Sequence, residues 1–387
     1  MQQKLRQSGS IFAQYLLKII SLDLWREHRT TPVLRIDKLD NDQIHVFKIW
    51  SAMLMSTPSE HQPQPTPRIF SRTFDEAEAA SQAILGLKRT SSQLTPGKLH
   101  AKCNFADFNS LKFVDVICNQ GWKTVGEKSS NSLEFVIEIS NTDSPLISHG
   151  YELKILDLFA FDYTREVDLI APKNSHIVIA SVDLNLFQSL AEEMGYDCFG
   201  LKFIQQNIVR FDPVSLEMLK AYYREISILL NTQPSLLMQP QMQSLIVDDF
   251  YPLLISTLGK KVRKKQQKPK IYRRYPLVKK AEEITRSDPD KPLTLKQLCS
   301  ELGTSSSALS YGFQDLFGMS PMAYIKTQRL NGVRRTLKKA DPKTTMVIGV
   351  AQQWGFWSNG HLARDYKQMF GELPSETLKQ SSKSKEI

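Results

Sequence analysis

Two similar stretches in the last quarter of the 387-residue chain constrain its fold more than any other feature. In residues 293–318, one helical pattern stops at Gly303 and a second stops at Gly318. Residues 347–371 repeat this plan with a turn at Gly355, and the spacing from turn glycine to closing glycine is 15 residues (303 to 318) and 16 residues (355 to 371). Glycine readily adopts the left-handed conformation that ends many helices. Two short helices joined by such a turn form a helix-turn-helix, so the sequence predicts two of these motifs in tandem.

A single long helix is expected between the two motifs, over residues 320–339. Ser320 suits the position before the helix, and Pro321 suits its first turn, where a missing N–H is not needed. A helix of about 18 residues is roughly 27 Å long at 1.5 Å per residue. That length can hold two recognition helices near the ~34 Å repeat of one DNA turn, on the same face of the duplex.

The net charge of +10 is unevenly distributed along the chain. Residues 1–258 hold 24 basic and 29 acidic side chains, a net of −5, whereas residues 259–387 hold 26 and 11, a net of +15. The densest run, residues 260–274, has nine basic residues and no acidic one. Such asymmetry predicts a polyanion-binding module joined to another domain. The run itself is either a solvated linker or a segment that contacts phosphates.

Two stretches within residues 275–378 carry a specific resemblance, SPMAYIKTQRL (320–330) and GFWSNGHLARDYKQMFGELPSETL (355–378). With them, residues 275–378 resemble the DNA-binding domain of the AraC/XylS family of bacterial transcription regulators. The details W-G-F-W-x-x-G-H and Y-x-F-Q are similar to the branch that contains the ethanolamine-operon regulator. A weaker likeness to the effector domain of that branch extends over residues 68–258.

The resemblance implies which side chains meet DNA. The base-facing positions of the first recognition helix fall on Ser307, Ser310 and Tyr311. Those of the second fall on Asn359, Gly360 and Arg364, with His361 beside them. Arg364 suits guanine and Asn359 suits adenine. Phosphate contacts are expected from Ser358, Lys367, Lys326 and Arg329.

The first recognition helix departs from the family pattern. Family members usually carry an arginine or a similar residue there, but residues 305–315 contain no Lys or Arg. We therefore expect the second motif to dominate sequence reading. Phe313, Trp354, Phe356, Leu362 and Tyr366 are expected in the core, and Trp357 is expected at the exposed turn.

Residues 67–258 read as strands followed by helices. Short segments rich in Val, Ile and Phe, separated by turn residues, predict a small β-barrel or jelly roll that can hold a ligand in its interior. Helical spacing follows in residues 183–258. One apolar helix face, marked by Leu216, Leu219, Tyr223, Ile226 and Leu230, either covers the barrel or forms a dimer surface.

The expected fold class is α+β, with a cupin-like β-barrel or jelly-roll domain with helices followed by an all-α domain with tandem helix-turn-helix motifs. The expected organisation is a poorly ordered extension (1–66), an effector-sensing or dimerisation domain (67–258), a basic linker (259–274), the DNA-binding domain (275–380) and a disordered tail (381–387). Translation starting at Met53 or Met55 is a further hypothesis.

Enzymatic and metal-dependent functions are not expected. The seven histidines form no H-x-H or H-x-x-x-H pair in the barrel region, and His149 and His176 read as turn or edge residues. The four cysteines lie far apart, which fits neither a zinc site nor the nucleophile of DNA-repair methyltransferases that carry a similar DNA-binding domain. No cofactor is predicted, and no apolar run is long enough to cross a membrane.

The expected function is a cytoplasmic, nucleoid-associated transcription regulator that binds double-stranded promoter DNA. RNA polymerase is the expected partner, and activation is the expected mode. A small-molecule effector in the N-terminal domain is expected, and a homodimer remains open. The alternative is an N-terminal domain that serves only for dimerisation or protein interaction, without a ligand.

Overall fold

The structure is a computed structural model, and it describes residues 68–80, 88–129, 131–140, 142, 144–153, 157–159, 162–211, 213–259, 270–287 and 293–381. Contacts divide the chain into two units, Met1–Thr66 and Pro67–Ile387, and all described residues lie in the second. The predictions for residues 1–66, including the translation start, lie outside the described residues. The same holds for the tail beyond residue 381 and for residues 260–269 of the basic run.

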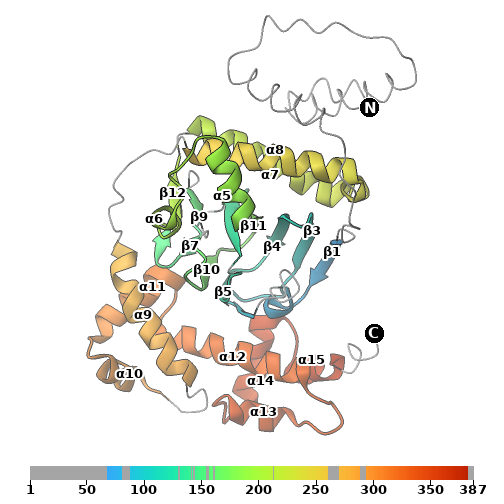
Figure 1. Ribbon diagram of the computed structural model, residues 1–387. Coiled ribbons are helices and arrows are strands. Elements are labelled where there is room, and N and C mark those ends of the chain that lie inside the picture. The colour runs from blue at the N-terminus through green and yellow to red at the C-terminus, as the bar shows by residue number, and fades with distance from the viewer. Residues whose placement is uncertain are drawn as a thin grey trace, which may run out of the picture. The chain divides into compact units, whose positions relative to one another are not determined.

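Two antiparallel sheets form the first part of the described chain, the β domain (Figure 1). The larger sheet has the strand order β1 (Arg68–Phe74), β3 (Ala101–Asp107), β4 (Leu111–Cys118), β11 (Ser175–Asp183), β6 (Ser132–Glu138), β9 (Asp157–Phe159) and β12 (Ile208–Arg210). The smaller sheet has the order β2 (Arg89–Gln93), β5 (Trp122–Gly126), β10 (Val167–Ala171), β7 (Ile147–Ser148) and β8 (Tyr151–Glu152).

The two sheets share one apolar core. It combines Val114, Val136 and Ile177 of the larger sheet with Leu169 and Ala171 of the smaller one, all of them buried. Successive side chains along a strand point to opposite faces of the sheet, so every second one turns toward this core. The prediction of an α+β chain with a jelly-roll-like first domain is confirmed.

Helices cover the other face of the larger sheet. They are α5 (Leu184–Glu193), α6 (Leu201–Ile204), α7 (Pro213–Thr232) and α8 (Pro240–Gly259). The predicted apolar face of α7 is buried against the sheet, where the Tyr223 hydroxyl donates to the Phe135 carbonyl at 3.3 Å and its ring lies 6.0 Å from that of Phe113. The reading of this face as a cover for the sheet is confirmed, and the dimer-surface alternative is wrong.

A buried polar cluster ties α7 to the larger sheet. His176 Nε2 lies 2.6 Å from Asp115 Oδ1, and the Ser227 hydroxyl of α7 donates to the same oxygen at 2.9 Å. Burial alone would raise the pKa of Asp115, but hydrogen bonds from His176 and Asn104 hold it below its usual value. The edge-residue prediction for His176 is wrong because β11 pairs on both sides, whereas His149 occupies the turn between β7 and β8 as expected.

The rest of the described chain is helical. Its elements are α9 (Lys270–Ser287), α10 (Leu295–Leu302), α11 (Ser306–Phe317), α12 (Pro321–Lys339), α13 (Val347–Gln353), α14 (Asn359–Phe370) and α15 (Pro374–Gln380). We call α9–α15 the helical domain. The predicted long helix is α12, and it links a first core around Phe313 to a second core around Tyr366. Among the described residues, no helix has the length and apolarity required to cross a membrane.

Candidate nucleic-acid interface

The first helix-turn-helix is built by local signals. Thr294 and Gln297 form a reciprocal capping box at the start of α10, and Gly303 ends that helix with φ +60°. Ser305 then caps α11 by accepting from the Ala308 N–H at 3.2 Å. These three devices fix the angle between α10 and α11, and they place the N-terminal turn of α11 at the surface.

The predicted base-facing residues of the first motif lie on the outer side of α11. Ser307 is exposed, Ser310 is half-buried, and the Tyr311 ring is 59% exposed, so packing in the core does not explain it. Arg274 of α9 stacks on this ring with its guanidinium carbon 5.3 Å from the centroid and pairs with Asp315 of α11.

Sequence reasoning missed this arginine as a functional residue. Arg274 ends the basic run, and α9 begins within that run, at Lys270. The first recognition helix thus has a cation beside it although its own sequence contains none. The only signal in the sequence was that the basic run continues directly into a helix.

The second helix-turn-helix repeats the geometry with one difference. Gly355 and Gly371 take φ +74° and +77°, and Trp354 Nε1 donates to the Thr336 hydroxyl of α12 at 3.0 Å. Ser358 has the residue type and the position of an N-cap for α14, but a cap assigned on that basis is wrong, because its side chain forms no cap hydrogen bond. Its φ of −118° differs from the −80° of Ser305, and its exposed hydroxyl therefore does not serve the helix.

In the second motif, the predicted core residues are buried or half-buried, and the predicted turn residue is exposed. Leu362 and Tyr366 are buried, as predicted, and Trp354 and Phe356 pack at the margin of the same core, half-buried. Trp357 is 72% exposed at the turn, also as predicted.

The α14 surface carries the remaining predicted residues. Gly360, His361, Arg364 and Lys367 are all exposed, and Arg364 is 72% exposed. Arg364 Nε lies 3.7 Å from Asp365, a distance too long for a strong hydrogen bond. Asn359 is the first residue of α14, and its side chain is not among those that the structure describes.

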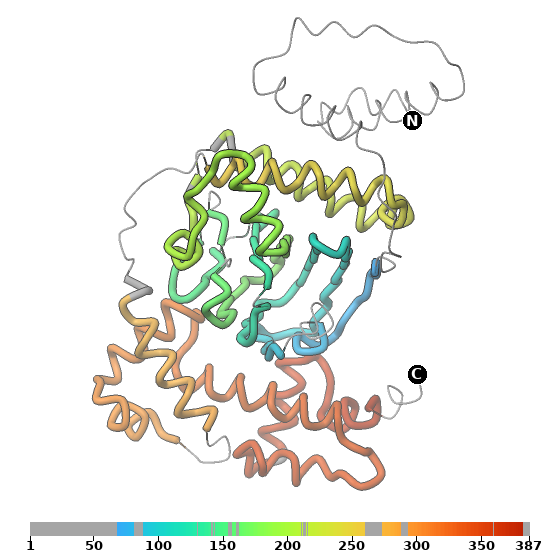
Figure 2. Tube along the Cα trace, viewed as in Figure 1, coloured from blue at the N-terminus to red at the C-terminus, as the bar shows by residue number. Residues whose placement is uncertain are grey.

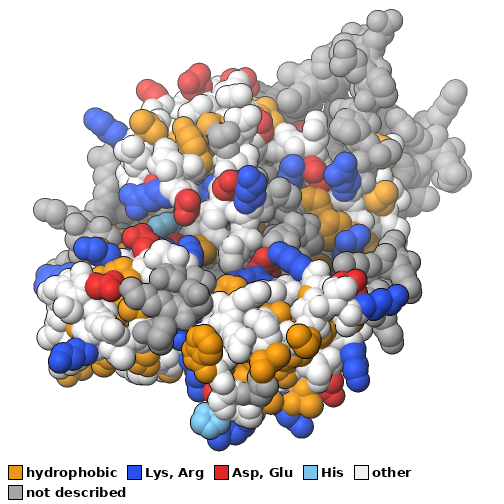
Figure 3. Space-filling model, turned by 90° about the horizontal axis from the view of Figure 1, so that it is seen from below, with side chains coloured by type: hydrophobic (Ala, Val, Ile, Leu, Met, Phe, Trp, Pro, Cys, Tyr) orange, Lys and Arg blue, Asp and Glu red, His pale blue; other side chains and the backbone are white. Residues whose placement is uncertain are grey.

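The two predicted phosphate contacts of α12 are engaged within the protein. Lys326 Nζ lies 3.1 Å from Asp365 of α14, and half-buried Arg329 also interacts with another residue. The Lys326 side chain is 51% exposed, so the pair is worth little and can exchange for a phosphate. Figure 3 shows Lys and Arg side chains scattered around apolar patches on the face seen from below.

The β domain contacts the helical domain away from these exposed side chains. Strand β2 meets α12 through a two-way amide pair, in which Gln93 N donates to Asn331 Oδ1 and Asn331 Nδ2 donates to Gln93 O, both at 2.9 Å. Gln93 Nε2 and Gly97 N also both donate at 3.0 Å to the Met369 carbonyl in the last turn of α14. The backbone between β2 and β3 accordingly lies beside the helical domain (Figure 2). The β2–β3 loop thereby holds the C-terminal end of the second recognition helix.

A buried charge cluster makes the second contact between the domains, at α9. Lys123 Nζ of β5 lies 2.5 Å from Glu282 Oε1, with both side chains at most 5% exposed. Asp168 of β10 accepts from Lys279 and from the Tyr275 hydroxyl, each at 2.7 Å. Burial alone would raise the pKa of Asp168, but the ammonium groups of Lys123 and Lys279 hold it below its usual value.

Comparisons with known proteins find relatives of the helical domain. A family model described as a helix-turn-helix domain matches residues 298–380. The probable thc operon regulatory protein of Rhodococcus erythropolis is 38% identical over 103 residues, which are 27% of this chain and 31% of that protein. The XylDLEGF operon transcriptional activator of Pseudomonas putida is 31% identical over 91 residues, 24% of this chain and 28% of that protein. The helical domain belongs to the AraC/XylS family.

A solved structure is also similar to this AraC/XylS domain. It is described as a probable AraC family transcriptional regulator from Rhodopseudomonas palustris CGA009. The two are 39% identical in sequence, the match covers 27% of this chain and 97% of that chain, and the TM-score is 0.25. The chain spans less than a third of the length of the two curated relatives described above.

Proposed function

We propose that the protein is a sequence-specific DNA-binding transcription regulator of the AraC/XylS type, with double-stranded promoter DNA as its ligand. The observation that carries the proposal is the exposed N-terminal half of α14, where the side chains of Arg364 and His361 face solvent on a recognition helix of an AraC/XylS domain. A planar, always charged guanidinium suits the O6 and N7 acceptors of guanine in the major groove. Tyr311 and Ser307 of the first motif add weaker contacts, with Arg274 supplying charge.

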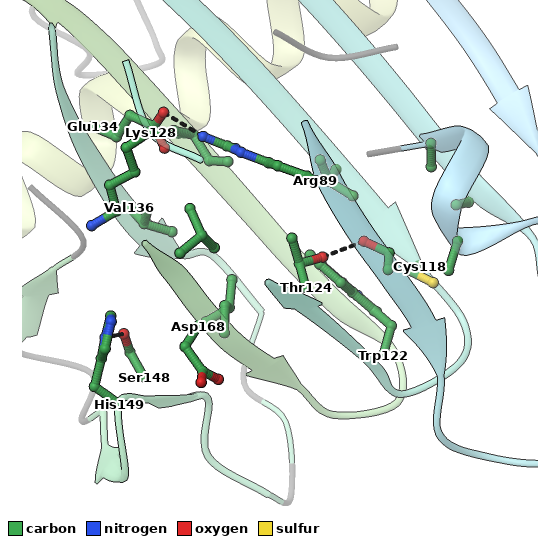
Figure 4. A pocket seen from close by; sticks show the side chains of 18 of the residues that line it. Arg89, Cys118, Trp122, Thr124, Lys128, Glu134, Val136, Ser148, His149 and Asp168 are labelled. Carbon is green, nitrogen blue, oxygen red and sulfur yellow. Dashed lines mark hydrogen bonds and ion pairs between the residues drawn. The ribbon is translucent and has the colours of Figure 1, made fainter. Parts of the chain in front are cut away.

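Two features support control of DNA binding by the β domain. The contacts at Met369 and Glu282 join that domain to α14 of the second motif and to α9, which shares a core with α11 of the first motif, and they leave the recognition faces exposed. An interior cavity lined by apolar and polar side chains lies between its two sheets (Figure 4). That cavity favours a small-molecule effector over the alternative of an interaction module without a ligand. An effector changes DNA affinity only when it binds two arrangements of the domains unequally.

The finer expectations belong to the same proposal. They are transcription activation through RNA polymerase, a cytoplasmic and nucleoid-associated location, and a place beside the ethanolamine-operon branch of the family. The branch rests on the tryptophan and glycine pattern of residues 354–361.

Selection of binding sites from a random duplex library tests the function directly. The purified full chain should enrich one sequence motif, and genome-wide mapping of the tagged protein should find that motif upstream of genes. Absence of any enriched motif in both experiments would refute sequence-specific binding.

The basic run should contribute to DNA affinity without affecting sequence choice. Neutralising Lys260, Lys261, Lys264 and Lys265 with glutamine should reduce the slope of log affinity against log salt by up to about three to four, because each phosphate contact contributes roughly 0.9. Fluorescence anisotropy over a salt series measures this. Glutamine at the exposed Lys173 and Lys202 of the β domain is the control. An unchanged slope in the fourfold variant would show that the run does not contact DNA.

A further inference from the structure

The cavity between the two sheets is small and mostly apolar. Its walls include Val136 and Ile179 of the larger sheet and Leu169 of the smaller one, and its volume is about 60 Å³. A water molecule needs about 10–15 Å³ measured in this way, so the cavity has room for roughly four to six such positions. A ligand held entirely inside it would therefore have few heavy atoms.

Two of the charged groups in the cavity wall are neutralised by the protein itself. The Arg89 guanidinium lies 2.5 Å from the Glu134 carboxylate, a contact drawn as a dashed line in Figure 4. It also donates to the Glu127 carbonyl at 2.9 Å. Asp168 is compensated from outside the cavity by Lys279 and Lys123. Neither group attracts a ligand of opposite charge strongly.

Lys128 differs from these groups. Its ammonium donates to the Asp162 carbonyl at 2.8 Å, but within the described ranges no carboxylate forms an ion pair with it. Burial lowers the pKa of this ammonium to about 8. The neighbouring imidazole of His149 is no substitute cation, because burial lowers its pKa and both its nitrogens are engaged, with Ser148 and the Glu166 carbonyl, each at 3.0 Å. The cavity wall thus contains a cation that no carboxylate contacts directly, and the carboxylates of Glu134 and Asp162 act on it only at longer range.

A second polar group of the wall is also unsatisfied. The indole N–H of Trp122 is buried and finds no acceptor in the part of the chain that the structure describes. A buried donor without an acceptor costs free energy, and an oxygen atom of a bound molecule would remove that cost. In Figure 4, Trp122 and Lys128 stand on opposite sides of the cavity, with the apolar wall between them.

We propose that this cavity binds a short-chain organic anion, a monocarboxylate of about three to five carbons, with its carboxylate on Lys128 and its apolar body against Val136, Leu169 and Ile179. The proposal rests on the proposed function only in that this molecule would serve as the effector. A buried ammonium that no carboxylate contacts directly favours an anion, the apolar wall favours a hydrocarbon body, and the volume limits its length.

Ligand-observed NMR with the full chain tests the proposal, using butyrate, its neutral amide butyramide, and acetate as probes. Butyrate should show saturable binding that is at least about tenfold tighter than that of butyramide, since a hydrogen bond to a charged group is the stronger kind. Acetate should bind more weakly than butyrate because it lacks the apolar body. Equal binding of butyrate and its amide, or no butyrate binding, would overturn the proposal without requiring any variant.

Variants then assign the binding to Lys128. Lys128→Met and Lys128→Gln should each lose at least about tenfold in butyrate affinity, while Lys112→Met, a change on the outer surface, should bind butyrate like the wild type. Unchanged binding in both Lys128 variants would refute the site. Anisotropy of the same samples with the selected duplex and no butyrate measures DNA binding separately. For the wild-type chain, normal DNA binding without butyrate binding would contradict only the ligand, whereas absence of specific DNA binding would contradict the proposed function.

Discussion

Lys123→Met should lower the free energy of unfolding by about 3–5 kcal/mol, because the change leaves the Glu282 carboxylate buried without its closest cation. The remaining ammonium, that of Lys279, lies 3.9 Å from Glu282 and is held at 2.7 Å by Asp168. Among the residues that the structure describes, only the Tyr324 hydroxyl would still donate a hydrogen bond to the Glu282 carboxylate. Urea unfolding of the full chain, followed by far-ultraviolet circular dichroism, measures the loss.

Two controls separate this effect from the loss of any lysine. Lys112→Met removes a partly exposed partner of Asp107 at 3.3 Å and should cost no more than about 1 kcal/mol. The double variant Lys123→Met, Glu282→Met should recover much of the loss, because no buried charge is then left unpaired. If Lys123→Met were as stable as Lys112→Met, the buried pair would not tie the domains together.

The sequence predicts the helical domain well because its signals are local. The left-handed turns at Gly303 and Gly355 and the cap at Ser305 depend on residues within a few positions of each other. Ser358 shows the limit of this reasoning. The residue type suits a cap, but the backbone at the second turn differs from that at the first, so the hydroxyl forms no cap.

The contacts between the domains could not be predicted from one sequence. Lys123 and Glu282 are 159 residues apart, and Gln93 and Met369 are 276 apart. A lysine in a strand and a glutamate in a helix are ordinary surface residues until the fold brings them together. The same holds for Lys128, which no sequence pattern distinguishes from a surface lysine and which becomes a cavity cation only when the two sheets pack. Periodicity predicts which face of an element is buried, but it does not say against what.

Arg364→Ala should weaken specific DNA binding by about 1–3 kcal/mol, roughly fivefold to 150-fold, and relax the preference at one base pair. The guanidinium is 72% exposed and its closest carboxylate is 3.7 Å away, so its removal leaves no buried group unpaired and should not affect folding. Anisotropy with the selected duplex, with single-base variants of it, and with a scrambled duplex measures the change.

Lys367→Ala is the matched comparison on the same helix, because Lys367 is an exposed cation predicted to contact phosphate. It should weaken specific and scrambled duplexes about equally and reduce the salt slope by about one. Each of the two substitutions removes one positive charge from α14, but only Arg364→Ala should change the sequence preference of DNA binding. If Arg364→Ala also weakened both duplexes equally, Arg364 would contact phosphate. Sequence reading by this domain would then have to come from the neighbouring positions of α14 or from Tyr311 and Arg274 at the first motif.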